Sequence, residues 1–165
     1  MKLIGHTEEI NGKVFAHVSP YLVPAANPIS HVDGVFNGIL VDANMLGRAL
    51  FYGAGAGKLP TASAVVADII DILSNRAGER KSPIWVNAQP EQIAAIDSYE
   101  CRRCVMIEGC HRCAEKAKNA LGADGFVCVK DGKYAVISAK MSANAAQAAL
   151  QSAGLEAVLT LPVLD

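Results

Sequence analysis

Three alternating glycines, in the segment Gly53-Ala54-Gly55-Ala56-Gly57, separate a strand-like stretch from a helix-forming one. Glycine allows positive φ and close approach to the backbone, so the run predicts a tight strand-to-helix turn. Pro60 and Thr61 follow, and proline suits the first helical turn, where its missing N–H costs nothing. The free N–H groups of that turn favour an anion. Spacing alone favours a tightly packed turn over a cofactor site, because the run is not Gly-x-Gly-x-x-Gly.

Turn signals divide the rest of the first half into two hairpins. Asn11-Gly12 is the strongest short hairpin signal in the chain. The strand Gly34–Asp42 is largely apolar at both sets of alternate residues, which predicts that both of its faces are covered, another subunit being one candidate cover. The expected elements are strands at Lys2–Ile10, Lys13–Tyr21, Gly34–Asp42 and Gly47–Tyr52, and a helix at Thr61–Asn75.

The second half has the order β-α-β-β-α-β, which predicts a ferredoxin-like α+β sandwich. Ser142 is the expected N-cap of its second helix. The whole chain is expected to be α+β: an antiparallel or mixed sheet with a helix, followed by the small ferredoxin-like domain. The predicted domains are residues 1–78, a linker at 79–98, and residues 99–165. Expected elements are strands at Cys101–Ile107, Gly125–Lys130, Lys133–Ala139 and Leu155–Leu161, and helices at Cys110–Leu121 and Ser142–Ala153.

Charge and hydropathy exclude several classes of protein. The 15 basic and 16 acidic residues leave no basic footprint for nucleic acid, and Lys and Arg are expected to be scattered over the surface. No apolar run is long enough to span a bilayer. The first residues turn acidic too soon for a signal peptide, so a cytoplasmic location is expected. No partner that would orient His6, His17 or His31 as a base can be named from the sequence.

Four cysteines form two Cys-x-x-Cys pairs, Cys101 with Cys104 and Cys110 with Cys113. Four thiolates can bind zinc tetrahedrally. A strand would point Cys101 and Cys104 to opposite faces, however, and the interval between the pairs is short for a zinc site. Free thiols and a zinc site both stay open, and we predict no bound metal. A helix N-terminus makes Cys110 the expected reactive thiol. Cys128 is expected to be small core filler.

Three blocks resemble homoserine dehydrogenase in order and spacing. They are Val18-Ser19-Pro20-Tyr21-Leu22-Val23-Pro24, Val32-Asp33-Gly34-Val35-Phe36-Asn37-Gly38-Ile39, and the segment from Phe51 to Asp68 that contains the glycine run. The resemblance implies part of a catalytic domain whose sheet builds a homodimer. It implies interconversion of L-homoserine and L-aspartate 4-semialdehyde with NAD or NADP, in threonine and methionine biosynthesis. Gly57 falls where the family contacts the cofactor, and Gly53, Gly55 and Thr61 are weaker matches.

The family's Rossmann domain, which binds most of the cofactor, and its catalytic lysine have no counterpart in these 165 residues. The resemblance therefore implies the C-terminal portion of the enzyme, with no catalytic residue of its own, inactive unless a missing domain or a separate chain supplies the rest. The second half resembles a shortened ACT-type regulatory domain, although Glu108-Gly109-Cys110 replaces the usual Asp-x-Pro-Gly-like turn. The alternative is a non-catalytic regulatory or zinc-binding module.

Overall fold

The computed structural model describes residues 1–74, 84–130 and 132–164, and its fold is mixed α+β. Contacts divide the chain into two compact units: residues 1–27 together with 88–165, and residues 28–87. The predicted sequence domains do not anticipate this grouping of the N-terminal hairpin with the C-terminal half. Their boundaries stay a prediction, and the polar segment 76–82 lies outside the described residues.

The first unit opens with an antiparallel hairpin, β1 (Lys2–Ile10) and β2 (Lys13–Tyr21), with the bounds that the sequence predicts. Asn11 and Gly12 have φ of 52° and 75°. Positive φ at both central residues is what a type I′ turn requires, and this turn matches the right-handed twist of the strands. Alternation then places Phe15 and Tyr21 on one face, where both are buried.

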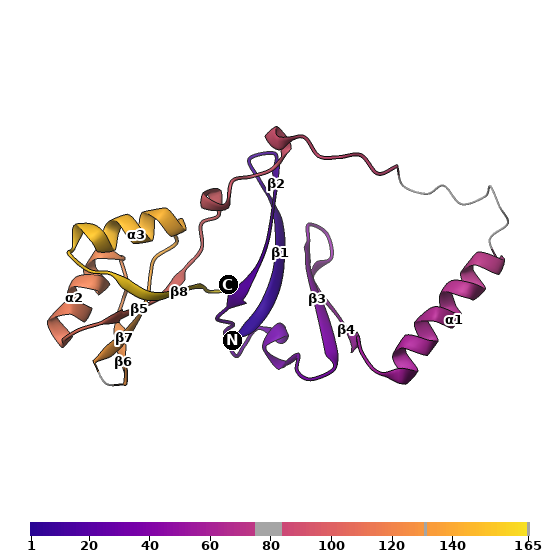
Figure 1. Cartoon of the computed structure of the whole chain (residues 1–165), viewed down its shortest axis with the longest axis horizontal. Coiled ribbons are helices and arrows are strands. Elements are labelled where there is room, and N and C mark those ends of the chain that lie inside the picture. The colour runs from indigo at the N-terminus through magenta and orange to yellow at the C-terminus, as the bar shows by residue number, and fades with distance from the viewer. Residues whose placement is uncertain (75–83, 131, 165) are drawn as a thin grey trace. The chain divides into compact units, whose positions relative to one another are not determined.

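The C-terminal half of this unit contains β5 (Arg103–Glu108), α2 (His111–Ala120), β6 (Phe126–Lys130), β7 (Lys133–Ile137), α3 (Ala143–Ser152) and β8 (Ala157–Pro162). The predicted β-α-β-β-α-β order is therefore present. All strand pairs of this sheet are antiparallel, in the order β6-β7-β5-β8. Figure 1 shows α2 and α3 beside this sheet, and their buried alanines and leucines pack with Val105, Ile107 and Val136. Ser142 caps α3 as predicted, its Oγ accepting a hydrogen bond from the Ala145 N–H at 3.2 Å.

The hairpin joins this half through backbone and side-chain contacts. Short 3-10 helices, η2 (Pro90–Gln92) and η3 (Ile96–Ser98), precede β5. Parallel bridges pair Val14 with Ile93 and Leu22 with Val163. A second core lies under the hairpin and consists of Phe15, Tyr21, Ala94, Tyr99 and Cys101.

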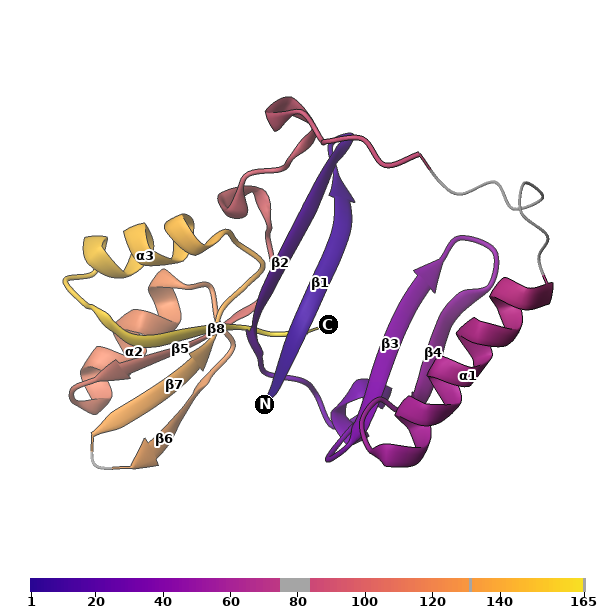
Figure 2. The ribbon, with the colours of Figure 1, turned by 45° about the vertical axis from the view of Figure 1, so that its right-hand side comes forward.

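The second unit contains a 3-10 helix, η1 (Pro28–His31), the antiparallel pair β3 (Phe36–Ala43) and β4 (Gly47–Ala54), and α1 (Lys58–Ser74). Figure 2 shows α1 following β4 through the glycine-rich loop. The helix begins at Lys58 rather than Thr61, because the turn tightens at once into helical hydrogen bonding, with Thr61 N–H donating to Gly57 C=O at 3.1 Å. Among the described residues, no helix is both long enough and apolar enough to cross a membrane.

Candidate functional site

The glycine-rich loop takes its shape from the end of β4. Gly53 still belongs to that strand, opposite Asn37 of β3, and the Gly55 N–H donates to Val35 C=O at 3.0 Å. A Cβ at Gly55 would overlap the side-chain amide of Asn37. The glycine at 55 is thus explained by packing of the loop against β3, rather than by an approaching ligand.

Gly53 and Gly57 have different surroundings. A Cβ at Gly53 would meet nothing within 4 Å, and one at Gly57 would meet only Pro60, at 3.6 Å. Gly57 has φ of +117°, a conformation that L-residues rarely adopt. The backbone of the loop is therefore open to an approaching group at both positions.

The start of α1 provides the electrostatic part of this arrangement. The first turn contains Lys58 and no acidic residue, and its Pro60 and the exposed Thr61 lie beside the loop. A helix N-terminus carries partial positive charge on its unpaired N–H groups, which favours phosphate. Of the four residues proposed to face a cofactor, Gly53, Gly57 and Thr61 thus have open surroundings that fit one wall of a dinucleotide site. Gly55 instead packs against Asn37, and whether any of the four touches a cofactor stays a prediction.

Helix α1 is apolar but uncovered. None of its residues is buried, and its seven branched aliphatic side chains are each at least half exposed: Leu59, Val65, Val66, Ile69, Ile70, Ile72 and Leu73. The predicted broad apolar face is present in the sequence of the helix, and it finds no partner in the described residues. An exposed apolar surface of this kind marks an interaction site.

The hairpin β3–β4 has one partly covered and one open face. Around Gly38, the close neighbours are Ile29, Val32 and Leu50, so the η1 segment covers part of that face. Phe36 and Tyr52 on the same face are still 42% and 54% exposed. On the other face, Ile39 and Phe51 are opposite each other in register and are 64% and 63% exposed. This chain itself thus supplies only part of the predicted cover, on one face, and cover by another subunit stays a prediction.

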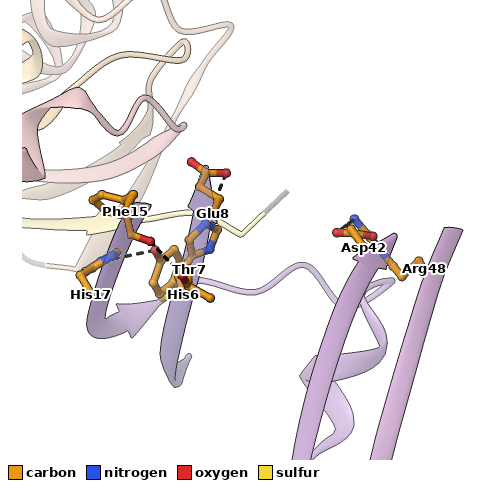
Figure 3. Close-up of polar contacts among 8 residues, drawn as sticks. His6, Thr7, Glu8, Phe15, His17, Asp42 and Arg48 are labelled. Carbon is orange, nitrogen blue, oxygen red and sulfur yellow. Dashed lines mark hydrogen bonds and ion pairs between the residues drawn. The ribbon is translucent and has the colours of Figure 1, made fainter. Parts of the chain in front are cut away.

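A salt bridge fixes the end of this hairpin (Figure 3). Arg48 Nε donates to Asp42 Oδ1 at 2.8 Å, and Arg48 Nη2 donates to Oδ2 at 3.2 Å. The hydrogen bond from Arg48 lowers the pKa of Asp42. Both groups are exposed, so the pair orients the turn between Ala43 and Gly47 more than it stabilises the fold.

Under the first hairpin, histidine and tyrosine side chains gather in a cluster that the sequence did not predict. His6 and His17 are opposite each other in register, as expected for paired strands. The Tyr21 hydroxyl lies 3.4 Å from His17 Nε2. Figure 3 shows His6 beside Glu8, and His6 Nε2 lies 3.5 Å from a Glu8 carboxylate oxygen. His6 Nε2 and His17 Nδ1 are buried and accept or donate no hydrogen bond among the described residues.

Burial dominates the electrostatics of this cluster. Desolvation lowers the pKa of His17, and the nearby His6 and Arg103 lower it further. Desolvation raises the pKa of Tyr21 and, with a hydrogen bond to Tyr21, that of Tyr99. The surroundings of the cluster therefore favour the uncharged forms of His17, Tyr21 and Tyr99. Tyr21 follows His17 by four residues along β2, and an even spacing places two residues on the same face of a strand. This spacing was the signal in the sequence that could have predicted the cluster.

Arg103 is the second feature that the sequence did not predict, since basic residues were expected at the surface. Its side chain is buried, and the guanidinium donates to two carbonyls: Nε to Met141 O and Nη2 to Tyr99 O, both at 3.1 Å. The Arg103 N–H donates to Ser138 Oγ at 3.0 Å. These bonds fasten the segment before β5 to the start of α3.

The cysteines separate into different environments, and none of those in the described residues forms a disulfide. Cys101 is buried under the hairpin, and Cys104 is half-buried on β5, where burial raises its thiol pKa. Cys110 and Cys113 lie together at the start of α2, with their sulfur atoms 3.2 Å apart. Cys128 is exposed, so the prediction of core filler is wrong: it lies on β6, at the edge of the sheet, and does not join the core cluster.

No group of three or more His, Cys, Asp or Glu side chains is arranged to hold a metal ion within residues 1–74, 84–130 and 132–164. The expected absence of a metal stays a prediction.

Comparison with known proteins agrees with the resemblance seen in the sequence. The family model described as homoserine dehydrogenase matches residues 1–70. The homoserine dehydrogenase of Neisseria gonorrhoeae is 53% identical over 72 residues, which are 44% of this chain and 17% of that protein. The homoserine dehydrogenase of Lactococcus lactis is 42% identical over 73 residues, again 44% of this chain and 17% of that protein.

Solved structures extend the likeness to almost the whole chain. The crystal structure of a homoserine dehydrogenase from Thiobacillus denitrificans has a TM-score of 0.77 at 25% identity, covering 99% of this chain and 42% of that one. A homoserine dehydrogenase structure from S. aureus has a TM-score of 0.72 at 26% identity, covering 99% and 41%. The proteins found in all three comparisons are oxidoreductases. The particular family that all of them indicate is homoserine dehydrogenase, and the chain spans less than half the length of these relatives.

Proposed function

We propose that this chain supplies part of a homoserine dehydrogenase, which interconverts L-homoserine and L-aspartate 4-semialdehyde with NAD or NADP in threonine and methionine biosynthesis. The observation that carries the proposal is the glycine-rich loop, open at Gly53 and Gly57, inside the segment that matches the family model. The nicotinamide, when bound, exchanges a hydride with the substrate carbon. The part assigned to this chain is one wall of the site, at Gly53, Gly57 and Thr61.

The same proposal assigns the rest of the cofactor site to a nucleotide-binding body outside these 165 residues, on the same polypeptide or another one. The uncovered apolar face of α1 supports this, because burying several aliphatic side chains stabilises an assembly by about 25 cal/mol per Å² of apolar surface. The relatives are also much longer than the region they share with this chain. By itself, the chain is therefore expected to be inactive.

The test uses the 165-residue chain and a chimera. The chain alone should show no NAD- or NADP-dependent oxidation of homoserine. In the chimera, residues 1–70 replace the matching segment of the Neisseria gonorrhoeae enzyme, and its kcat/KM should stay within about tenfold of the parent, or 1.4 kcal/mol. NAD- or NADP-dependent turnover by the chain alone would refute the proposal that the chain supplies only one side of the cofactor site. A folded but inactive chimera would refute the proposal that the chain is part of a homoserine dehydrogenase.

We also propose that the open face of β3–β4 forms a homodimer interface. Ile39, Val41 and Phe51 share that face by register and are 64%, 40% and 63% exposed. An isologous contact between two copies would bury this apolar surface on both. The chain should sediment as a dimer at micromolar concentration, and Phe51→Glu should make it a monomer. The control is Val18→Glu, which also replaces an exposed apolar residue by an acidic one, but on β2. If the unaltered chain is a monomer, the proposed interface is excluded.

The second half is proposed to be a ferredoxin-like, ACT-like regulatory domain. The strand order β6-β7-β5-β8 and the packing of α2 and α3 against β5 and β7 support this fold assignment. A cytoplasmic location belongs to the same proposal. The exposed thiols of Cys110 and Cys128 support it, since such thiols persist in reducing compartments.

A further inference from the structure

The thiols of Cys110 and Cys113 are in direct contact at the start of α2, with their sulfur atoms 3.2 Å apart. We propose that this pair is a thiol–disulfide exchange site, which a small-molecule disulfide such as oxidised glutathione converts reversibly into a Cys110–Cys113 disulfide. The proposal concerns the second half of the chain and is independent of the function proposed above.

The local backbone holds the two sulfur atoms together. Cys110 is the N-cap of α2, with φ −99° and ψ 170°, and the Cys113 N–H donates to Cys110 C=O at 2.9 Å. An S–S bond is about 2.05 Å long, so oxidation requires the sulfur atoms to approach by roughly 1 Å. Side-chain rotation within one helical turn supplies a movement of that size.

Gly109 makes room for this pair. A Cβ at residue 109 would lie 3.1 Å from both Cβ and Sγ of Cys113, closer than ordinary packing allows. The Gly109 N–H also donates to Gly132 C=O at 2.8 Å, which ties the turn before α2 to the residue that precedes β7. The Cys113 side chain packs against the core formed by Ala114, Ala117 and their neighbours, while Cys110 is exposed.

The two cysteines differ in exposure, and this assigns their roles. Cys110 is exposed and Cys113 is half-buried, so an incoming disulfide reaches Cys110. Hydrogen bonds from the Cys113 thiol and from backbone N–H groups of the first turn lower the pKa of Cys110, which increases its thiolate fraction. Cys110 is thus the attacking thiol, and Cys113 the resolving one.

The exchange balances in two steps. The Cys110 thiolate attacks one sulfur of glutathione disulfide, an S–S bond forms to Cys110, and one glutathione thiolate leaves. Cys113 then loses its proton and attacks Cys110 Sγ, so that the Cys110–Cys113 bond forms and the second glutathione thiolate leaves. The protein dithiol is oxidised, glutathione disulfide is reduced to two thiols, and excess reduced glutathione reverses both steps.

The test is a redox titration of the whole chain in glutathione buffers, followed by acid quenching, alkylation and peptide mass spectrometry. The expected product is a Cys110–Cys113 peptide that has lost two hydrogen atoms and returns to the dithiol under dithiothreitol. Cys113→Ser should instead keep one glutathione on Cys110 as a lasting mixed disulfide. Cys110→Ser should slow oxidation of Cys113 at least about tenfold, because the exposed attacking thiol is lost.

Cys128→Ser is the matched control, since Cys128 is an exposed thiol on β6 rather than in this turn, and its loss should leave the Cys110–Cys113 titration unchanged. Circular dichroism of each variant verifies that the helix content of the chain is unchanged. A lasting glutathione adduct on Cys110 in the unaltered chain would overturn the proposal. So would a dithiol that stays reduced in all buffers, or a purified protein whose zinc is lost in Cys110→Ser.

Discussion

The ring of Phe15 stacks on the ring of Tyr99, with centroids 4.7 Å apart and planes inclined by 20°. Phe15 lies on β2 near the start of the chain, and Tyr99 lies just before β5. Stacked rings at this separation contribute about 0.5–1.5 kcal/mol beyond the area they bury. The contact is therefore a main attachment of the first hairpin to the C-terminal half.

The first prediction follows from this stack. Phe15→Ala should lower the free energy of unfolding by about 3–5 kcal/mol, since it removes a fully buried aromatic ring and leaves a cavity beside Tyr21 and Tyr99. Urea denaturation measures the loss. The control is Val18→Ala on the exposed face of the same strand, which should change stability by less than about 0.5 kcal/mol. Equal effects of the two substitutions would show that the hairpin is not attached through Phe15.

Local sequence signals predicted the elements well, because each signal acts within a few residues. Asn11-Gly12 fixed the bounds of β1 and β2 through its two positive φ values, and Ser142 fixed the start of α3. The β-α-β-β-α-β order followed from apolar periodicity and turn residues in the same way. Pairing of the first hairpin with residues 88–165 was not predictable, since neither the Val14–Ile93 bridge nor the Phe15–Tyr99 stack has a local signal.

The candidate site was predicted unevenly for a related reason. The glycine run identified the loop, but only the structure separates Gly55, which packs on Asn37, from the open Gly57. Burial of Arg103 could not be read from the sequence, because its partners are carbonyl groups of Tyr99 and Met141, which every residue type possesses.

The second prediction concerns Arg103. Arg103→Met keeps the length of the side chain but removes both donors, so the Tyr99 and Met141 carbonyl groups each lose a buried charged donor, although Met141 keeps the Cys101 N–H. The free energy of unfolding should fall by about 2–3 kcal/mol. Arg112→Met on the exposed side of α2 is the control and should be near neutral. Thermal and urea unfolding of both variants measure the difference, and a neutral Arg103→Met would mean that water replaces the guanidinium at no cost.

The third prediction is a pH dependence of stability that originates at His17. Burial and the neighbouring His6 and Arg103 lower the pKa of His17 below its ordinary value of 6.5. Because the unfolded chain then binds the proton more tightly, stability from this group is present above pH 6.5. It is lost progressively as the pH falls from 6.5 toward the lower folded pKa.

His17→Gln should reduce the slope of unfolding free energy against pH just below pH 6.5, as measured by urea denaturation at closely spaced pH values. His31→Gln, in the short η1 helix, is the control and should leave the slope as it is. A slope that is unchanged in His17→Gln would place the pH dependence elsewhere. NMR titration of the ring of His17 gives an independent reading of its pKa.

The last prediction concerns Gly57, tested in the chimera with the Neisseria gonorrhoeae enzyme. Two effects of Gly57→Val must be separated, because a β-branched residue resists φ of +117° and also fills space in front of the loop. A Cβ at Gly57 meets only Pro60, at 3.6 Å, so the substitution has room within the chain. Backbone strain should therefore lower the free energy of unfolding by about 1–3 kcal/mol. Cofactor affinity should fall for a different reason, because the new side chain occupies space that the cofactor needs.

Gly47→Val separates the two effects, because Gly47 has φ of +74° in the turn between β3 and β4, with nothing within 4 Å of its Cβ position. Both variants should lose stability, but only Gly57→Val should raise the KM for NAD or NADP, by about tenfold or more, since a side chain there displaces the cofactor from the loop. Steady-state kinetics at saturating homoserine measures KM, and urea denaturation measures stability. If both variants lose stability equally and neither changes the KM, Gly57 is needed only for the conformation of the turn, and the cofactor does not bind next to it.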